Sequence, residues 1–285
     1  MMRKIVTFML LLVCHTQIQA GDVEEVRFLS HGDSLTGSIY FPDNDIDLIS
    51  AVVFVHGSGK QRRNSQLGKR FAKHGIAALV YDKRGAGSSE GEYESNQSVS
   101  GKNISLLADD AAAAVKFLQQ HSKLNGVPIG LTGISQAGWI VPLAAERSDK
   151  LDFIALWSSP VGKVSEEDIF SKYTADADTK SVPSYAEALS ARKRPYIWPD
   201  FLGKDTDPSE NLARLTMPGL WVFGKNDGSI PVDLSIERLE QRIDAGQPYS
   251  YVLFSDEGHN NMDNTFTTVM GWIRRISFPR LATQS

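Results

Sequence analysis

A single serine stands between two glycines near the middle of this 285-residue chain. The stretch GISQAG, residues 133–138, follows the short apolar run VPIGLT, and Ser135 is its hydroxyl-bearing residue. A serine in a glycine-rich turn can be an ordinary loop residue. In a tight bend between a strand and a helix, however, the hydroxyl is exposed and can act as a nucleophile. Such a serine needs a base to take its proton, and the base needs an orienting partner.

Residues of the required types follow apolar runs later in the chain. Asp227 comes shortly after LWVF, and His259 comes shortly after YVLF. In open α/β sheets, ligands bind beyond the carboxyl ends of the strands. Ser135, Asp227 and His259 each come just past an expected strand end. We therefore expect the serine, the carboxylate and the imidazole to meet along one edge of the sheet.

Two other acids compete with Asp227 for the role of orienting partner. Asp233 is expected inside the following helix, and Asp256 is expected to shape the turn before His259. Asp227 is favoured because it stands at the strand exit, where the acid is needed. His259 is favoured as the base because it alone follows a late strand. The other histidines fall in the N-terminal segment, in loops or at expected helix ends: His15, His31, His56, His74 and His121.

The arrangement of apolar runs predicts the elements that position these residues. Continuous apolar runs such as AVVFV, IAALVY and FIALW alternate with stretches of helical periodicity such as residues 104–121. This alternation is typical of an α/β fold with a mostly parallel, doubly wound sheet. EEVRFLS and LTGSIYFP alternate apolar and polar residues and predict an antiparallel N-terminal pair of strands. The stretch from about 161 to 215 breaks the pattern, and we expect it to form an inserted helical lid.

The chain resembles the α/β-hydrolase superfamily at these motifs. The family's nucleophile elbow reads G-x-S-x-G, and its triad follows in the order Ser, Asp or Glu, His. The elbow here departs from that pattern at one place, since Ala137 stands where the second glycine is usual. One added methyl group predicts an adapted elbow. GKNDGSIP resembles the family's acid loop, EGHN its histidine loop and HGSG its oxyanion loop.

The resemblance implies a serine hydrolase that cleaves carboxylic esters through an acyl-enzyme intermediate. Ser135 would be the nucleophile, His259 the base and Asp227 the residue that orients it. The backbone N–H groups of Ser58 and Gln136 would stabilise the oxyanion. Two alternatives stay open: a peptidase or amidase that uses the same triad, and a non-catalytic binding scaffold.

In the turn DKRGAG we expect Asp82 and Arg84 to be structural. We expect Asp109 and Asp110 to form a solvated or turn-bracing helix face.

The first twenty residues have the pattern of a secretory signal peptide. A short positive start, MMRK, precedes the apolar run IVTFMLLLVC, and Ala20 offers a cleavage point. We therefore expect a domain over residues 21–285, exported to the periplasm or secreted after cleavage. A membrane anchor is disfavoured because the apolar run is short. A lipoprotein modified at Cys14 is disfavoured because Val13 is larger than such processing favours. Removal of this segment would take away the only cysteine.

Composition narrows the classes of partner. The formal net charge of −4 and the lack of a strongly basic block give no support to nucleic-acid binding. GSGK and GAGSSE fail the nucleotide-binding patterns, and DNDID lacks the glycine of a calcium loop. The sequence therefore predicts no nucleotide, metal or other cofactor. The expected partner is a small-molecule ester or a short peptide, with no membrane association after signal removal.

Overall fold

The computed structural model describes residues 21–95 and 98–281. The predicted signal peptide, residues 1–20, lies outside the described residues. Within the described part, no helix is both long enough and apolar enough to cross a membrane.

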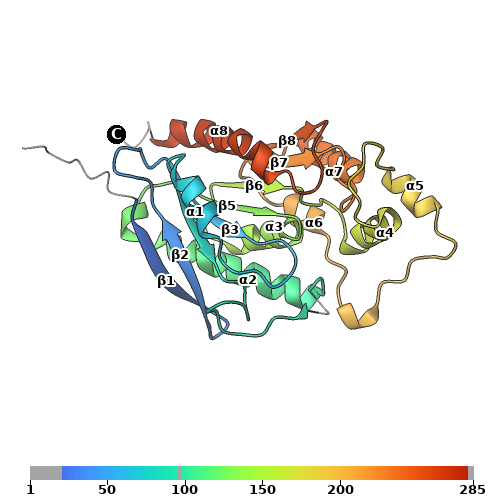
Figure 1. The fold of residues 1–285 in the computed structure, drawn as a ribbon, viewed down its shortest axis with the longest axis horizontal. Coiled ribbons are helices and arrows are strands. Elements are labelled where there is room, and N and C mark those ends of the chain that lie inside the picture. The colour runs from blue at the N-terminus through green and yellow to red at the C-terminus, as the bar shows by residue number, and fades with distance from the viewer. Residues whose placement is uncertain (1–20, 96–97, 282–285) are drawn as a thin grey trace, which may run out of the picture.

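Eight strands form one sheet in the order β1-β2-β4-β3-β5-β6-β7-β8 (Figure 1). β1 pairs with β2 and β2 pairs with β4 in antiparallel fashion, and all other pairs, from β4 to β8, are parallel. The predicted α/β fold with a mostly parallel sheet and an antiparallel N-terminal pair is thereby confirmed. The strands are Val23–Ser30 (β1), Asp33–Tyr40 (β2), Ser50–Val55 (β3), Ile76–Tyr81 (β4), Ile129–Ile134 (β5), Phe153–Trp157 (β6), Gly219–Gly224 (β7) and Tyr249–Phe254 (β8).

Helices cover both faces of the sheet, which explains the continuous apolar runs. All residues of β3, β4, β6 and β7 are buried, and their side chains alternate between two apolar cores. α2, α3 and α7 pack on one face, and α1 and α8 pack on the other. The helices on the sheet are Ser65–Ala72 (α1), Gly101–Gln119 (α2), Ala137–Arg147 (α3), Val232–Asp244 (α7) and Met262–Leu281 (α8), and a short 3-10 helix, η2, covers Ser122–Leu124.

α2 begins three residues earlier than the periodicity predicted. The hydroxyl of Ser100 accepts a hydrogen bond from the N–H of Asn103 at 3.1 Å and caps the helix. Gly101 and Lys102 lie in the capped first turn, where apolar periodicity gives little signal.

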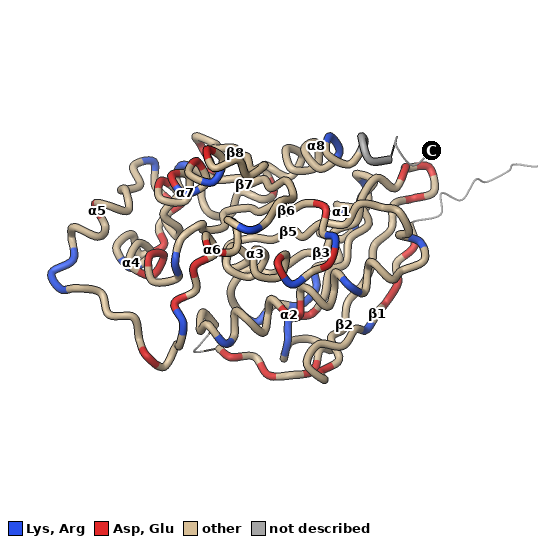
Figure 2. The backbone as a smooth tube through the Cα atoms, turned by 180° about the vertical axis from the view of Figure 1, so that it is seen from behind, with Lys and Arg blue, Asp and Glu red and all other residues tan. Residues whose placement is uncertain are grey.

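The stretch predicted to be a lid lies between β6 and β7. It contains α4 (Val164–Thr174), α5 (Tyr185–Ser190), the 3-10 helix η3 (Asp200–Leu202) and α6 (Pro208–Leu212). Figure 1 shows that the chain from α4 to η3 extends away from the end of the sheet, while α6 returns beside α3. Figure 2 shows acidic and basic residues interleaved along this segment, as they are along the rest of the described chain.

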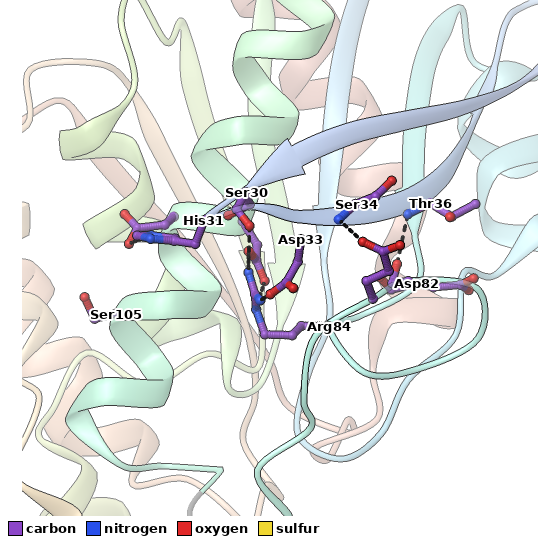
Figure 3. A network of polar contacts seen from close by, with 12 residues as sticks. Ser30, His31, Asp33, Ser34, Thr36, Asp82, Arg84 and Ser105 are labelled. Atoms are coloured by element: carbon purple, nitrogen blue, oxygen red, sulfur yellow. Dashed lines mark hydrogen bonds and ion pairs between the residues drawn. The ribbon is translucent and has the colours of Figure 1, made fainter.

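A buried ion pair fixes the glycine-rich turn after β4. Arg84 donates two hydrogen bonds to Asp110 on α2, from Nη2 at 2.6 Å and from Nε at 3.1 Å, and it also pairs with Asp33. Figure 3 shows Arg84 beside Asp33, below the turn that joins β1 to β2. Asp82 accepts from the N–H groups of Ser88 and Arg63, both at 2.8 Å. Asp82 and Arg84 therefore brace the turn as expected. Of the two roles predicted for Asp110, the structure shows the turn-bracing one, since Asp110 is buried and bonded to Arg84.

We expect Asp110→Ala to lower the free energy of unfolding by about 3–5 kcal/mol, because it leaves the guanidinium of Arg84 buried with only a half-exposed partner. Urea unfolding measures the loss. Asp109→Ala is the matched control, since Asp109 forms only partly exposed pairs with Arg147 and His31. It should cost about 1 kcal/mol or less. Equal losses in the two variants would contradict this account.

Candidate active site

Ser135 lies at a strained bend between β5 and α3. Its φ of +55° is in the left-handed region, which residues with a side chain rarely adopt. The bend is held by two backbone hydrogen bonds, from Ser135 N–H to the carbonyl of Trp157 at 3.1 Å and from Gly138 N–H to the carbonyl of Ser135 at 2.8 Å. Strain of this kind is found mainly where the surrounding structure enforces it. The bend presents the hydroxyl of Ser135 at the carboxyl end of β5.

The alanine at position 137 fits because the residue opposite it is glycine. A Cβ added to Gly133 would lie 2.5 Å from the Cβ of Ala137 and 2.6 Å from the carbonyl oxygen of Val55. Ala137 itself is fully buried. The space that a second glycine would leave is therefore occupied by one methyl group, and the bend keeps its close packing.

The three residues predicted to form a triad lie in one hydrogen-bonded chain. His259 Nε2 lies 3.0 Å from Ser135 Oγ, and His259 Nδ1 lies 2.9 Å from Asp227 Oδ2 and 3.0 Å from Asp227 Oδ1. Asp227 is buried and also accepts from the N–H groups of Ser229 and Ile230. An Nδ1–H that donates to Asp227 leaves Nε2 free to accept a proton from the serine.

The competing acids are placed elsewhere. Asp233 lies in α7 and accepts a hydrogen bond from the N–H of Tyr185 at 2.9 Å. Asp256 lies in the turn after β8, where the hydroxyl of Ser255 donates to it at 3.2 Å. Asp227 is thus the acid that contacts the imidazole.

Neighbouring carboxylates raise the pKa of His259. Burial of the imidazole opposes protonation, but the hydrogen bond to Asp227 and its negative charge outweigh that effect. The charges of Asp178 and Glu167, both from the segment between β6 and β7, act in the same direction. Burial raises the pKa of Glu167 to about 8, so its charge adds to the effect mainly at alkaline pH. Near neutral pH the imidazolium of His259 is stabilised chiefly by Asp227 and Asp178.

The predicted oxyanion loop packs directly against the elbow. A Cβ added to Gly57 would lie 3.3 Å from the carbonyl oxygen of Ile134 and 3.4 Å from the Cβ of Ser135. Among the described residues, the backbone N–H groups of Ser58 and Gln136 have no hydrogen-bond partner. Two unused donors therefore flank Ser135, which is an arrangement that could bind an oxyanion.

His56 fixes this loop from below rather than acting as a base. Its Nε2–H donates to the carbonyl of Tyr81 at 2.5 Å, and its ring is buried against Phe54 and Tyr81. Burial lowers the pKa of His56 to about 4, so the imidazole is neutral at physiological pH.

Asp178 was not among the residues predicted from the sequence, yet it contacts both loops of the triad. Its Oδ2 accepts from the N–H of His259 at 3.0 Å, and its Oδ1 accepts from the N–H of Gly228 at 2.9 Å. A Cβ on Gly228 would lie 2.0 Å from the carbonyl oxygen of Ala177, and one on Gly258 would lie 2.1 Å from Asp178 Oδ2. The glycines in NDGS and DEGH were the only signal of this close approach. Lys83, buried beside Gln136, was also missed.

Ser135 and His259 open into a cavity of about 400 Å³. Its walls are part apolar and part polar, and they include Phe54, Leu67, Met262, Gln61, Arg62 and Asn260. Among the described residues, no group of three or more His, Cys, Asp or Glu side chains is arranged to hold a metal ion.

Comparison with known proteins agrees with this fold. Residues 48–185 match the family model described as serine aminopeptidase, S33. The chain is 28% identical over 253 residues to esterase EstD of Thermotoga maritima, a match that covers 80% of this chain. The chain spans 58% of the length of that relative.

Solved structures share the fold at lower identity. An esterase of Pyrococcus furiosus superposes with a TM-score of 0.65 at 18% identity, covering 91% of this chain and 92% of the other. Acetyl xylan esterase 1 of a Thermoanaerobacterium species gives 0.67 at 13% identity, over 92% and 86%. An acylaminoacyl peptidase of Pyrococcus horikoshii gives 0.63 at 19% identity, over 90% of this chain and 41% of the peptidase.

The chain has the α/β-hydrolase fold, as its sheet order and these structural matches show. The matches support a place in the branch of that superfamily that contains serine esterases and peptidases.

We expect Asp178→Asn to lower the pKa of His259, because it removes a negative charge that favours the imidazolium. An NMR titration of the histidine ring signals measures this, with His259→Asn used to assign the resonance. Asp176→Asn is the control, since Asp176 is an exposed acid two residues away whose carboxylate bonds to neither loop. A pKa of His259 that is unchanged or raised in Asp178→Asn would refute the assignment.

Proposed function

We propose that the protein is a serine hydrolase that cleaves carboxylic esters through an acyl-enzyme intermediate. The observation that carries this proposal is the continuous chain of hydrogen bonds from Ser135 through His259 to Asp227. A free serine hydroxyl is a weak nucleophile at neutral pH, and this chain supplies the base that removes its proton during attack.

In the first half of the reaction, Ser135 Oγ attacks the ester carbonyl and its proton passes to His259 Nε2. The negative oxygen of the tetrahedral intermediate receives hydrogen bonds from the N–H groups of Ser58 and Gln136. The intermediate then collapses. The bond to the alcohol oxygen breaks, His259 gives its proton to that oxygen, and the acyl group stays on Ser135.

In the second half, a water molecule attacks the acyl group while His259 takes one of its protons. Collapse of the second tetrahedral intermediate breaks the bond to Ser135 Oγ, and the imidazolium returns the proton to the serine. Asp227 keeps Nδ1 protonated and stabilises the positive imidazolium in both halves.

The comparisons support an ester substrate, because the relative from Thermotoga maritima and two of the structural neighbours are named esterases. A cavity of about 400 Å³ with mixed walls suits a small acyl group better than a long lipid chain. A peptidase or amidase is the second candidate, favoured by the description of the matching family model and by the acylaminoacyl peptidase neighbour.

We further propose that residues 161–215 act as a lid, since Asp178 and Glu167 of this segment approach His259.

We also propose that the protein is exported after cleavage near Ala20. The pattern of the first twenty residues supports this proposal.

A fluorophosphonate probe should label the protein at Ser135, because the triad activates that hydroxyl. Mass spectrometry of the labelled peptide locates the adduct. Ser135→Ala should lose the label, and Ser159→Ala, which changes a buried hydroxyl near the end of β6, should keep it. Labelling that persists in Ser135→Ala would remove Ser135 as the nucleophile.

Short p-nitrophenyl esters should be turned over, with kcat/KM falling on the acid side as His259 becomes protonated. Because the pKa of His259 is raised from its ordinary value near 6.5, this fall should be centred above pH 6.5. His259→Ala should lower kcat by about 10³-fold or more. His31→Ala, which changes a histidine whose side chain is 56% exposed, is the control. Wild-type turnover no faster than buffer, with turnover of peptidyl amides instead, would favour the peptidase.

A further inference from the structure

Lys83 places a buried ammonium group next to the proposed active site. Its residue is only 3% exposed, and it lies in the turn that follows β4. Its Nζ donates to the carbonyl of Gly57 at 2.9 Å, to the carbonyl of Gly59 at 3.3 Å and to Gln136 Oε1 at 2.8 Å. An ammonium has three N–H donors, so the three acceptors match its full hydrogen-bonding capacity.

Each of these acceptors belongs to a segment that carries one of the free amides. Gly57 and Gly59 are the residues on either side of Ser58. The side chain of Gln136 belongs to the residue whose own N–H is the second free donor, and its Nε2 is held in turn by the carbonyl of Ser98 at 2.7 Å. The loop and the elbow come from different strands, β3 and β5. Among the described residues, Lys83 is the side chain that hydrogen-bonds to both.

The charged groups around Lys83 leave it without a carboxylate partner among the described residues. Asp82 is committed to the N–H groups of Arg63 and Ser88, and Arg84 turns away to Asp110 and Asp33. His56, which also packs against this turn, is neutral. Burying a cation without a counter-ion is costly in free energy, so the three neutral acceptors must replace the water that the ammonium of Lys83 has lost.

We propose that Lys83 is a positioning residue that holds the amide donors of Ser58 and Gln136 in the relative orientation needed to bind an oxyanion. The proposal rests on the serine hydrolase function proposed above. Its consequence is that the protonation state of one buried amine, which does not touch the reacting atoms, controls how well the transition state is bound.

Loss of a proton from Lys83 should loosen this arrangement. A neutral amine has two N–H donors for three acceptors, so one carbonyl or the Gln136 amide oxygen is left unpaired in a buried site. Burial lowers the pKa of Lys83 to about 8, which brings the change into an accessible pH range. Activity should therefore fall on the alkaline side as well as on the acid side governed by His259.

The experiment compares wild type with Lys83→Met, Lys83→Gln and Lys83→Arg. The control is Lys60→Met, which changes an exposed lysine on the loop after β3 that carries Ser58. Values of kcat and KM for a short p-nitrophenyl ester are measured from pH 6 to 10. The affinity of phenylboronic acid is measured at pH 7, because its adduct with serine places a negative tetrahedral oxygen where the oxyanion forms. Thermal unfolding and circular dichroism establish that each variant is folded.

We expect Lys83→Met to lower kcat by about ten- to a hundredfold, less than the 10²–10³ typical of removing a donor outright, with KM changed by less than about threefold. Boronate binding should weaken by about tenfold or more. The alkaline fall of wild-type kcat, centred near pH 8, should be absent in Lys83→Met and in Lys83→Arg, whose cation does not titrate in this range. Lys60→Met should behave as wild type.

Lys83→Met with wild-type kcat and the same alkaline fall would overturn the proposal, as would a loss of kcat without any loss of boronate affinity. If Lys83→Met does not fold, Lys83→Gln and Lys83→Arg decide between the same outcomes. Wild type that neither hydrolyses esters nor binds the boronate would overturn the proposed function itself, and with it the role of Lys83. That result is visible without any variant.

Discussion

The arrangement of the site depends on the two hydrogen-bonding contacts of the His259 imidazole. This imidazole joins Ser135, which is 124 residues earlier in the chain, to Asp227, which is 32 residues earlier. Three loops that follow β5, β7 and β8 must therefore end within hydrogen-bonding distance of one ring. Parallel strands meet this requirement because their carboxyl ends all lie at the same edge of the sheet. Helices bury both faces of the sheet, and this packing keeps the carboxyl ends of the strands in fixed positions relative to one another.

Backbone strain and close packing hold the serine in its place within this frame. A left-handed φ at Ser135 is unfavourable for a residue with a side chain, and it is maintained by bonds to the ends of β6 and α3. Gly133 and Ala137 leave room for only one methyl group between strand and helix. The bend is thus specified by its neighbours rather than by its own conformational preference.

Buried charge is used in two different ways around the turn after β4. Arg84 and Asp110 neutralise each other and brace the turn against α2. Lys83, one residue earlier, is met by neutral acceptors alone. On the other side of the site, Asp178 brings a charge from the segment between β6 and β7 to the backbone of His259 and Gly228. Any movement of that segment is therefore coupled to the loops that carry Asp227 and His259.

The sequence by itself determined the class of fold and the candidates for chemistry. Continuous apolar runs predicted the buried parallel strands. A strand that is covered on both faces exposes neither face to solvent, so polar residues do not alternate with apolar ones along it. Ser135, Asp227 and His259 could be chosen because each follows such a run, and a strand end is a local feature of the chain. The alternation in residues 24–42 likewise predicted the antiparallel pair.

Only the tertiary structure decided which polar groups meet. Nothing local distinguishes Asp178 from Asp176, or Asp110 from Asp109, since each pair has the same chemistry within two positions. The contacts of Lys83 depend on the loop after β3 and the bend after β5 coming together above the turn after β4. Local pattern records whether a residue faces core or solvent, whereas hydrogen-bond partners distant in sequence depend on how the elements pack, and that is fixed only when the whole chain has folded.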